Sequence, residues 1–239
     1  MKGVIIAGGT GTRLAPLTKV TNKCLLPVGQ TPLICRTLEL LVSSGIEDVM
    51  LVTSPDHMGQ VISLLGSGSE YGCSMSYKVQ DHANGIAAAL GLCKNFVNND
   101  KFVMILGDNI FSNHLEINSS IKEFFSSNED YMLFTKKVPD PQRFGVPVFL
   151  NGKIVDIVEK PKVPPSDEAV VGLYCYPSEV FEVINQLKPS FRGEYEISDV
   201  NSWLVKNRKG SFFSLDCDWI DAGTHESYRK ANEMVWRNE

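Results

Sequence analysis

The chain begins with an apolar stretch, residues 4–7, that leads directly into a glycine-rich loop, Gly8-Gly9-Thr10-Gly11. Two cations follow, Arg13 soon after the loop and Lys23 ten residues further along. Glycines allow backbone N–H groups to approach anionic oxygens closely, and cations neutralise the charge of those oxygens. A strand, a glycine loop and two cations in this order therefore predict a site for a polyphosphate, which the rest of the chain must complete.

Apolar segments of strand length alternate with segments of helical spacing through the first half of the chain. Strands are expected at residues 3–7, 48–53, 74–79 and 101–106. Helices are expected between them, at 32–44, 57–65 and 85–96. Continuous apolar strands that alternate with helices are typical of a mostly parallel sheet covered on both faces. The predicted fold class is therefore α/β.

The second half of the chain follows a different rhythm, with several strands in succession. Strands are expected at 131–137, 145–150, 153–159, 169–176 and 211–215, with a short segment at 218–221 and a turn at Asn151-Gly152. Helices are expected at 118–126, 178–187, 197–207 and 226–237. The linker-like stretch at 161–165 is too short to separate domains. We therefore expect one domain, 1–239, whose second half adds strands and loops over the mouth of the sheet.

Composition excludes several classes of partner. The net charge of −5 argues against binding to nucleic acid or to an anionic membrane, both of which favour a basic face. The six cysteines are scattered and form no zinc-binding spacing, which favours reduced thiols in a cytoplasmic protein. We find no export signal and no apolar run of the roughly 18 residues that cross a bilayer. The expected ligands are small molecules.

Two known kinds of phosphate-binding loop do not fit the opening stretch. A dinucleotide-binding loop would need glycine at the position of Leu14, and an acidic residue where Thr53 and Ser54 stand. A Walker loop would end in Gly-Lys-Ser or Gly-Lys-Thr, which is absent here. What remains is the string GGTGTRLAPLT followed by KCLLPV. This string resembles the N-terminal signature of the sugar-1-phosphate nucleotidylyltransferases.

The resemblance continues along nearly the whole chain. Its further segments are LGDNIF at 106–111, RFGV at 143–146, EKP at 159–161, RGEYEISD at 192–199 and WIDAGTH at 219–225. They are similar to the thymidylyl and uridylyl branch of the family, in a short form. The resemblance implies a Rossmann-like, mostly parallel mixed sheet with helices on both faces. It also implies a nucleotide-binding part, about 1–110, and a part for sugar binding and oligomerisation, about 111–239.

The implied reaction transfers a nucleoside monophosphate from dTTP, or from UTP, to a hexose 1-phosphate, with glucose 1-phosphate as the first choice. The products are dTDP-glucose, or the corresponding UDP-sugar, and pyrophosphate. The resemblance assigns catalytic roles to Arg13, Lys23 and Asp108. Arg13 and the backbone of Gly8, Gly9, Thr10, Gly11 and Thr12 would hold the β- and γ-phosphates. Lys23 would bridge the two reacting phosphates.

The remaining site residues also follow from the resemblance. Asp108 and Asp221 would hold Mg²⁺, which needs few protein ligands beside phosphates and water. Gln80 and Gly85 would contact the nucleobase, and a glutamine can pair with the edge of thymine or uracil. Lys160 and Arg192 would hold the phosphate of the sugar. The sugar hydroxyls would meet Glu159 and the backbone of Gly145 and Val171.

Structural roles compete with some of these assignments. Arg192 could simply pair with the nearby Glu194 and Glu196, and Asp221 could cap the helix that starts near Thr224. Asp108 and Asn109 could form an Asx turn.

The chain also departs from the family pattern. Cys24 and Phe144 stand where relatives carry glutamine and tyrosine, and Pro147-Val148 stands where relatives often carry an acidic contact to the sugar.

The alternative to an enzyme is a subunit that senses sugar nucleotides by binding them, without catalysing a reaction. The resemblance further suggests a homo-oligomer, dimer or tetramer.

Overall fold

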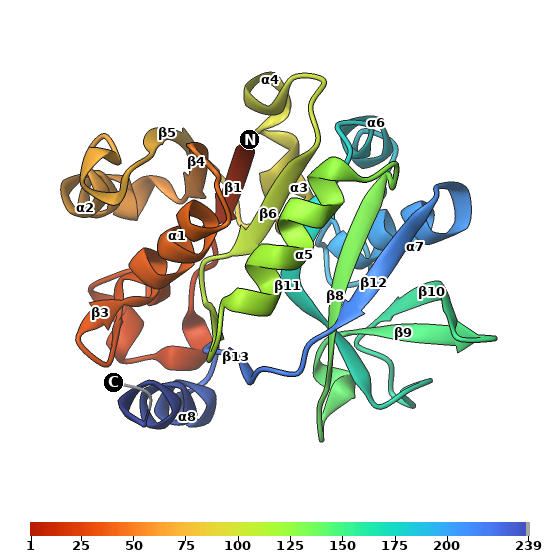
Figure 1. The fold of residues 1–239 in the computed structure, drawn as a ribbon. Helices are drawn as coiled ribbons and strands as arrows, with labels where there is room; N and C mark the ends of the chain where they lie inside the picture. Colours follow the sequence, from red (N-terminus) through yellow and green to blue (C-terminus); the bar gives the residue numbers. More distant parts are fainter. Residues whose placement is uncertain (238–239) are drawn as a thin grey trace.

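The computed structural model describes residues 1–237. At its centre lies a sheet of seven strands in the order β12-β8-β11-β6-β1-β4-β5 (Figure 1). Their bounds are β12 Gly210–Ser214, β8 Tyr131–Lys137, β11 Glu168–Tyr176, β6 Phe102–Leu106, β1 Lys2–Ile6, β4 Asp48–Thr53 and β5 Ser74–Val79. Neighbouring strands are parallel except where β11 is involved, because β11 runs antiparallel to both β6 and β8. The predicted α/β fold with a mostly parallel mixed sheet is confirmed.

Helices cover both faces of this sheet (Figure 1). One face packs against α1 (Leu33–Ser43), α2 (Pro55–Leu65) and α5 (Leu115–Ser126). The other packs against α3 (Ile86–Gly91), α4 (Lys94–Val97), α6 (Val180–Ile184) and α7 (Ile197–Asn207). Strand β6 serves both sides: Phe102 and Met104 belong to the core under α3 and α6, and Val103 and Ile105 to the core under α1 and α5. This two-sided burial explains why the strand reads as a continuous apolar run.

Two of the predicted helices have different bounds in the structure. The helix expected at 85–96 is divided into α3 and α4, because the backbone N–H groups of Leu92 and Cys93 bond to carbonyls only three residues back, which tightens the turn. The helix expected at 178–187 is reduced to the five residues of α6. In both places the apolar spacing correctly predicted a helix, but the helices are too short for this spacing to predict where they begin and end.

Smaller ladders surround the end of the sheet that carries the glycine loop. Strands β9 (Gly145–Leu150) and β10 (Lys153–Glu159) form the expected hairpin, with positive φ angles at Asn151 and Gly152 in the turn. Strands β2 (Pro27–Val28) and β3 (Thr31–Pro32) form a second pair, which packs near the final helix α8 (His225–Trp236). Strands β7 (Asn109–Phe111) and β13 (Trp219–Asp221) form a third pair, which the sequence did not predict.

Within residues 1–237, no helix has both the length and the apolar character that crossing a lipid bilayer requires.

Candidate active site

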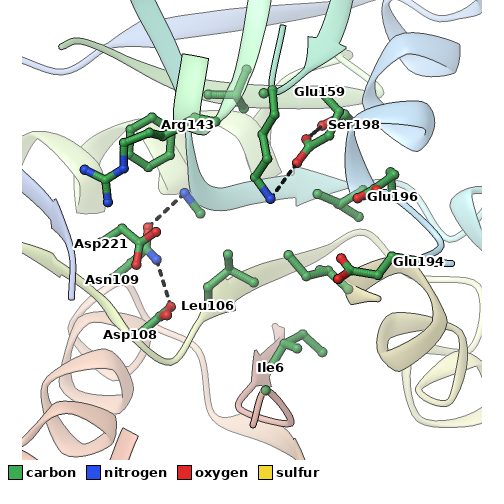
Figure 2. Close-up of a pocket in the computed structure, with 18 of the residues that line it drawn as sticks. Ile6, Leu106, Asp108, Asn109, Arg143, Glu159, Glu194, Glu196, Ser198 and Asp221 are labelled. Carbon is green, nitrogen blue, oxygen red and sulfur yellow. Dashed lines mark hydrogen bonds and ion pairs between the residues drawn. The ribbon is translucent and has the colours of Figure 1, made fainter. Parts of the chain in front are cut away.

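A pocket lies beside the carboxyl ends of β1 and β6, and residues from both halves of the chain line it. Figure 2 shows Asp108 and Asp221 on one side of this pocket and Glu159, Glu194 and Glu196 on the other. Open α/β sheets bind ligands at this edge of the sheet. The pocket brings together these predicted site residues: Gly8, Gly9, Arg13, Lys23, Asp108, Gly145, Glu159, Lys160, Arg192 and Asp221.

Asp108 and Asp221 are brought together by backbone pairing between segments more than a hundred residues apart. Asp108 directly precedes β7 and Asp221 ends β13, where it pairs with Asn109. The N–H of Ala222 donates to the carbonyl of Asp108 at 2.9 Å, which continues the ladder. Thr224 caps α8 together with Ser227. The capping role considered for Asp221 is therefore wrong, and its carboxylate faces the pocket (Figure 2).

Lys23 crosses to the same pair of carboxylates. It stands in a single 3₁₀ turn, Lys23–Leu25, and its ammonium donates to Oδ2 of Asp108. Burial alone would raise the pKa of Asp108, but the charge and the hydrogen bond of Lys23 outweigh burial and hold that pKa below its usual value. Conversely, burial would lower the pKa of Lys23, and the Asp108 charge raises it instead. Lys23 is therefore a partly buried side chain that carries its positive charge at neutral pH.

Asp221 has no comparable partner. Its Oδ1 is buried and accepts no hydrogen bond from any group in residues 1–237. Burial, and next the charge of Asp108, raise the pKa of Asp221 from 3.8 to about 6. Arg13 lies nearby, since a Cβ on Gly223 would lie 2.7 Å from Oδ1 of Asp221 and 3.0 Å from a guanidinium nitrogen of Arg13. The absence of a side chain at Gly223 therefore leaves room for both groups.

These two carboxylates suit a hard divalent cation. Within residues 1–237, no group of three or more His, Cys, Asp or Glu side chains is placed to hold a metal ion. Magnesium often binds through only one or two carboxylates, with substrate phosphates and water as the other ligands. The unpaired Oδ1 of Asp221 is a donor that such an ion would satisfy. The residues present therefore fit a divalent metal that arrives with a phosphate ligand.

The glycine loop closes the pocket on the side of β1. Gly8, Gly9 and Arg13 line the pocket, whereas Thr10, Gly11 and Thr12 do not. Gly11 has a left-handed φ of 64°, and its carbonyl accepts a hydrogen bond from the Thr18 hydroxyl at 2.8 Å. The loop therefore turns tightly before the 3₁₀ turn Thr12–Leu14, and this turn carries Arg13 to the pocket.

Gln80 and Gly85 do not line the pocket, and the Gln80 side chain lies against Gly8 of the glycine loop. The side-chain amide of Gln80 donates to Oδ1 of Asn84 at 3.1 Å and to the Gly85 carbonyl at 3.3 Å. Gly85 has a φ of 112°, and a Cβ there would lie 2.6 Å from the backbone nitrogen of Tyr195. Packing against Tyr195 thus accounts for glycine at this position. The assignment of both residues to nucleobase binding stays a prediction.

The far side of the pocket holds a cluster of opposite charges. Glu159 accepts a hydrogen bond from the Ser198 hydroxyl and forms ion pairs with Lys160 at 3.2 Å and with Arg192 at 3.4 Å. Lys160 has a left-handed φ of 43°, which is uncommon for a residue with a side chain and frequent at functional sites. Gly145 lies against this cluster, since a Cβ there would lie 2.9 Å from Oγ of Ser198.

Arg192 is enclosed by carboxylates. It pairs with Glu194 and Glu159, and its Nε lies 3.6 Å from Oε1 of Glu196. The structural role considered from the sequence is therefore observed. Arg192 also lines the pocket, so the two roles are compatible. Val171 of β11 is fully buried in the core and does not line the pocket, whereas its neighbours Val170 and Gly172 do.

Several lining residues were not predicted as site residues. Asn109 is buried; its amide donates to Oδ1 of Asp108 at 3.1 Å, and its Oδ1 accepts from the Gly172 N–H at 2.9 Å and the Trp219 indole N–H at 2.6 Å. It therefore joins Asp108 to β11 and β13. Arg143 lowers the pKa of Asp221, although less than Lys23 and Arg13 do. These residues lie in the segments LGDNIF, RFGV and WIDAGTH, which the resemblance had singled out. Their place in the site was not predicted, because it depends on contacts between segments that are distant in the sequence.

Comparison with known proteins agrees with this geometry. The sequence pattern of the nucleotidyl transferase family matches residues 2–238. A glucose-1-phosphate thymidylyltransferase from Neisseria meningitidis is 42% identical over 238 residues, which cover 98% of this chain and 82% of that protein. A crystal structure from Bacillus anthracis, described as a glucose-1-phosphate thymidylyltransferase, is 51% identical with a TM-score of 0.93, over 98% of this chain and 95% of that one.

A more distant structure, a UDP-glucose pyrophosphorylase, shares the fold at 24% identity, with a TM-score of 0.86 over 100% of this chain and 99% of that one. The match to the family pattern spans nearly the whole sequence, and the phosphate-site cations and both carboxylates that the resemblance required are present around one pocket. The chain therefore belongs to the nucleotidyl transferase family.

Proposed function

We propose that this chain transfers a thymidylyl group from dTTP to the phosphate of glucose 1-phosphate, forming dTDP-glucose and releasing pyrophosphate. The relatives at 42% and 51% identity bear the name of this activity. The structural observation that best supports it is that three groups line the same pocket. They are the glycine loop, Lys23 with its partner Asp108, and the cluster of Glu159, Lys160 and Arg192. UTP is the alternative nucleotide, because thymine and uracil present the same hydrogen-bonding edge.

The reaction is an in-line displacement at the α-phosphorus. An oxygen of the sugar phosphate forms a bond to this phosphorus, and the bond from it to the oxygen bridging the β-phosphate breaks. Pyrophosphate leaves with that electron pair. No general base is required, because the attacking oxygen is already anionic. Two anions must approach each other, so positive charge at their meeting point lowers the barrier. Lys23, a partly buried cation at the pocket wall, suits that position.

The other side chains would divide between the two substrates. Arg13 and the N–H groups of the loop from Gly8 to Thr12 would hold the β- and γ-phosphates. Lys160 and Arg192 would hold the sugar phosphate. Glu159, Gly145 and the backbone near Val171 would contact the sugar hydroxyls. Gln80 and Gly85 would contact the base.

Asp108 and Asp221 would hold Mg²⁺ at the triphosphate. When bound, this ion supplies positive charge where negative charge develops during phosphoryl transfer. The buried, unpaired oxygen of Asp221 supports this assignment, because a cation is the partner that it lacks.

The direct test measures pyrophosphate release with each of dTTP, UTP and CTP against glucose 1-phosphate and other hexose 1-phosphates. We expect release only when a triphosphate, a sugar phosphate and Mg²⁺ are all present, and fastest with dTTP and glucose 1-phosphate. No release from any pair would reject the proposal. Tight nucleotide binding by calorimetry without turnover would instead favour a sensing subunit.

Two variants test the assigned roles. Lys23→Ala and Asp108→Ala are expected to lower kcat at least about 10²-fold, because each removes a charge at the reacting phosphates. Lys206→Ala is the matched control, since Lys206 on α7 forms a partly exposed ion pair with Asp156 of β10 and does not line the pocket. Circular dichroism would verify that each variant is folded. Equal turnover in Lys23→Ala and Lys206→Ala would contradict the role of Lys23.

The predicted homo-oligomer, dimer or tetramer, stays a prediction. Size-exclusion chromatography with light scattering would measure it, and a monomer at micromolar concentration would contradict it.

A further inference from the structure

Asn22 is a buried polar residue next to Lys23 that does not line the pocket. The residue is 2% exposed. Its backbone is extended, with φ −68° and ψ 144°, and it caps the 3₁₀ turn that begins at Lys23. The Oδ1 of Asn22 accepts the N–H of Cys24 at 2.8 Å, and its amide donates to the carbonyl of Ala7 at 2.8 Å. Both halves of the amide are therefore engaged, and in different parts of the chain.

Each partner of Asn22 is attached to one side of the phosphate site. Ala7 directly precedes Gly8, the first residue of the glycine loop, and Cys24 directly follows Lys23. The Lys23 side chain extends along the loop: a Cβ on Gly9 would lie 3.6 Å from Cε of Lys23, and a Cβ on Gly11 would lie 3.4 Å from its Cβ. The spacing between loop and lysine is thus close to van der Waals contact, and Asn22 is hydrogen-bonded to a residue that adjoins each of them, Ala7 before the loop and Cys24 after the lysine.

We infer that Asn22 is a positioning residue, which fixes the Lys23 ammonium relative to the glycine loop. The inference rests on the proposed function, because it assigns Asn22 to the reaction through Lys23. A displacement of about 1 Å at a reacting centre can cost roughly 10²-fold in rate. Lys23 sits on a turn of only three residues, so the cap and the bond to Ala7 supply the rigidity that a longer helix would give.

Thr53 provides a matched control. Its hydroxyl donates to the same Ala7 carbonyl, at 3.2 Å, and its side chain is fully buried at the end of β4. Within residues 1–237, the Thr53 side chain makes this one hydrogen bond and none to the Lys23 turn. Thr53→Val therefore removes a buried hydrogen bond at the same acceptor without removing the cap.

The experiment compares Asn22→Ala, Asn22→Ser and Thr53→Val in steady-state pyrophosphate release, at a temperature well below the unfolding midpoint of each variant. We expect Asn22→Ala to lower kcat about 30- to 100-fold, with the KM for dTTP changed less than about threefold. Asn22→Ser should recover part of this loss, because a serine hydroxyl can also cap the turn. Thr53→Val should remain within about threefold of the wild type, even if its midpoint falls as far as that of Asn22→Ala.

Two outcomes would overturn the inference: kcat of Asn22→Ala within threefold of Thr53→Val, or kcat of Asn22→Ser no higher than that of Asn22→Ala. Both comparisons require an active wild type. Absence of wild-type turnover with every substrate pair would reject the proposed function itself, so the two failures are distinguishable.

Discussion

Asp221 combines a buried, unpaired oxygen with a second carboxylate nearby, and this arrangement has a cost in the metal-free protein. Because its pKa rises from 3.8 to about 6, the folded state retains a proton between these pH values that the unfolded chain releases. The free energy of unfolding therefore decreases as the pH rises from about 4 to about 6. Above that range, the charged side chain destabilises the fold.

We accordingly expect Asp221→Asn to raise the free energy of unfolding in EDTA at pH 7.5, by about 1–2 kcal/mol. The gain should shrink as the pH is lowered to 4.5. Urea unfolding at the two pH values measures this difference. Asp218→Asn, at an exposed position of the same segment, should stay within about 0.5 kcal/mol of the wild type at both. A gain independent of pH would show that the charge is not its cause.

Arg192 is held by three carboxylates, and an incoming phosphate would compete with them. Arg192→Ala is expected to raise the KM for the sugar phosphate about tenfold or more, with little change in the KM for dTTP, because its charge-assisted bonds would serve one substrate. Arg208→Ala is the control, since Arg208 pairs with Glu179 and stacks on Trp203 away from the pocket. Equal changes in both KM values would contradict the assignment.

At the scale of elements, the sequence predicted those parts whose signal is local. The strand at Phe102–Leu106 could be predicted from its own apolar run, and the β9–β10 hairpin could be predicted from its Asn-Gly turn. The pairing of β7 with β13 has no such signal, because each strand has three residues and its partner lies about 110 positions away. That pairing unites Asp108 with Asp221. The two carboxylates could therefore be identified by resemblance, but their proximity could not be derived from the sequence.

Strand β11 contributes a testable constraint through Gly172. A Cβ at this position would lie 2.6 Å from Oδ1 of Asn109 and 2.8 Å from Cδ1 of Leu106. We expect Gly172→Ala to lower the free energy of unfolding by about 1–3 kcal/mol through overpacking, and to lower turnover by disturbing Asn109.

Gly59→Ala is the opposite case. Gly59 lies in α2 with nothing within 4 Å of an added Cβ, so alanine should stabilise the fold by up to about 1 kcal/mol. Thermal unfolding would measure the stability of both variants, and pyrophosphate release would measure their turnover. If Gly172→Ala matched Gly59→Ala in stability, the close contact at Asn109 would be refuted.

At the scale of the whole molecule, both halves of the chain contribute to the central sheet. Strand β11, from the second half, pairs with β6 of the first, and β8 and β12 extend the sheet beyond it. We therefore propose that residues 1–239 unfold as one cooperative domain. Coincident urea transitions by fluorescence and by circular dichroism are the expected result. Two separate transitions, or cooperative folding of an isolated 1–110 fragment, would contradict it.

Among residues 1–237, the basic and acidic side chains of the pocket wall are equal in number: Arg13, Lys23, Arg143, Lys160 and Arg192 against Asp108, Glu159, Glu194, Glu196 and Asp221. Such a cleft is close to electroneutral, so a bare triphosphate entering it would bring several uncompensated negative charges. A divalent cation arriving with the triphosphate reduces this excess. By thermodynamic reciprocity, each ligand should then tighten the binding of the other. The cleft would thus select the metal–nucleotide complex over either component alone.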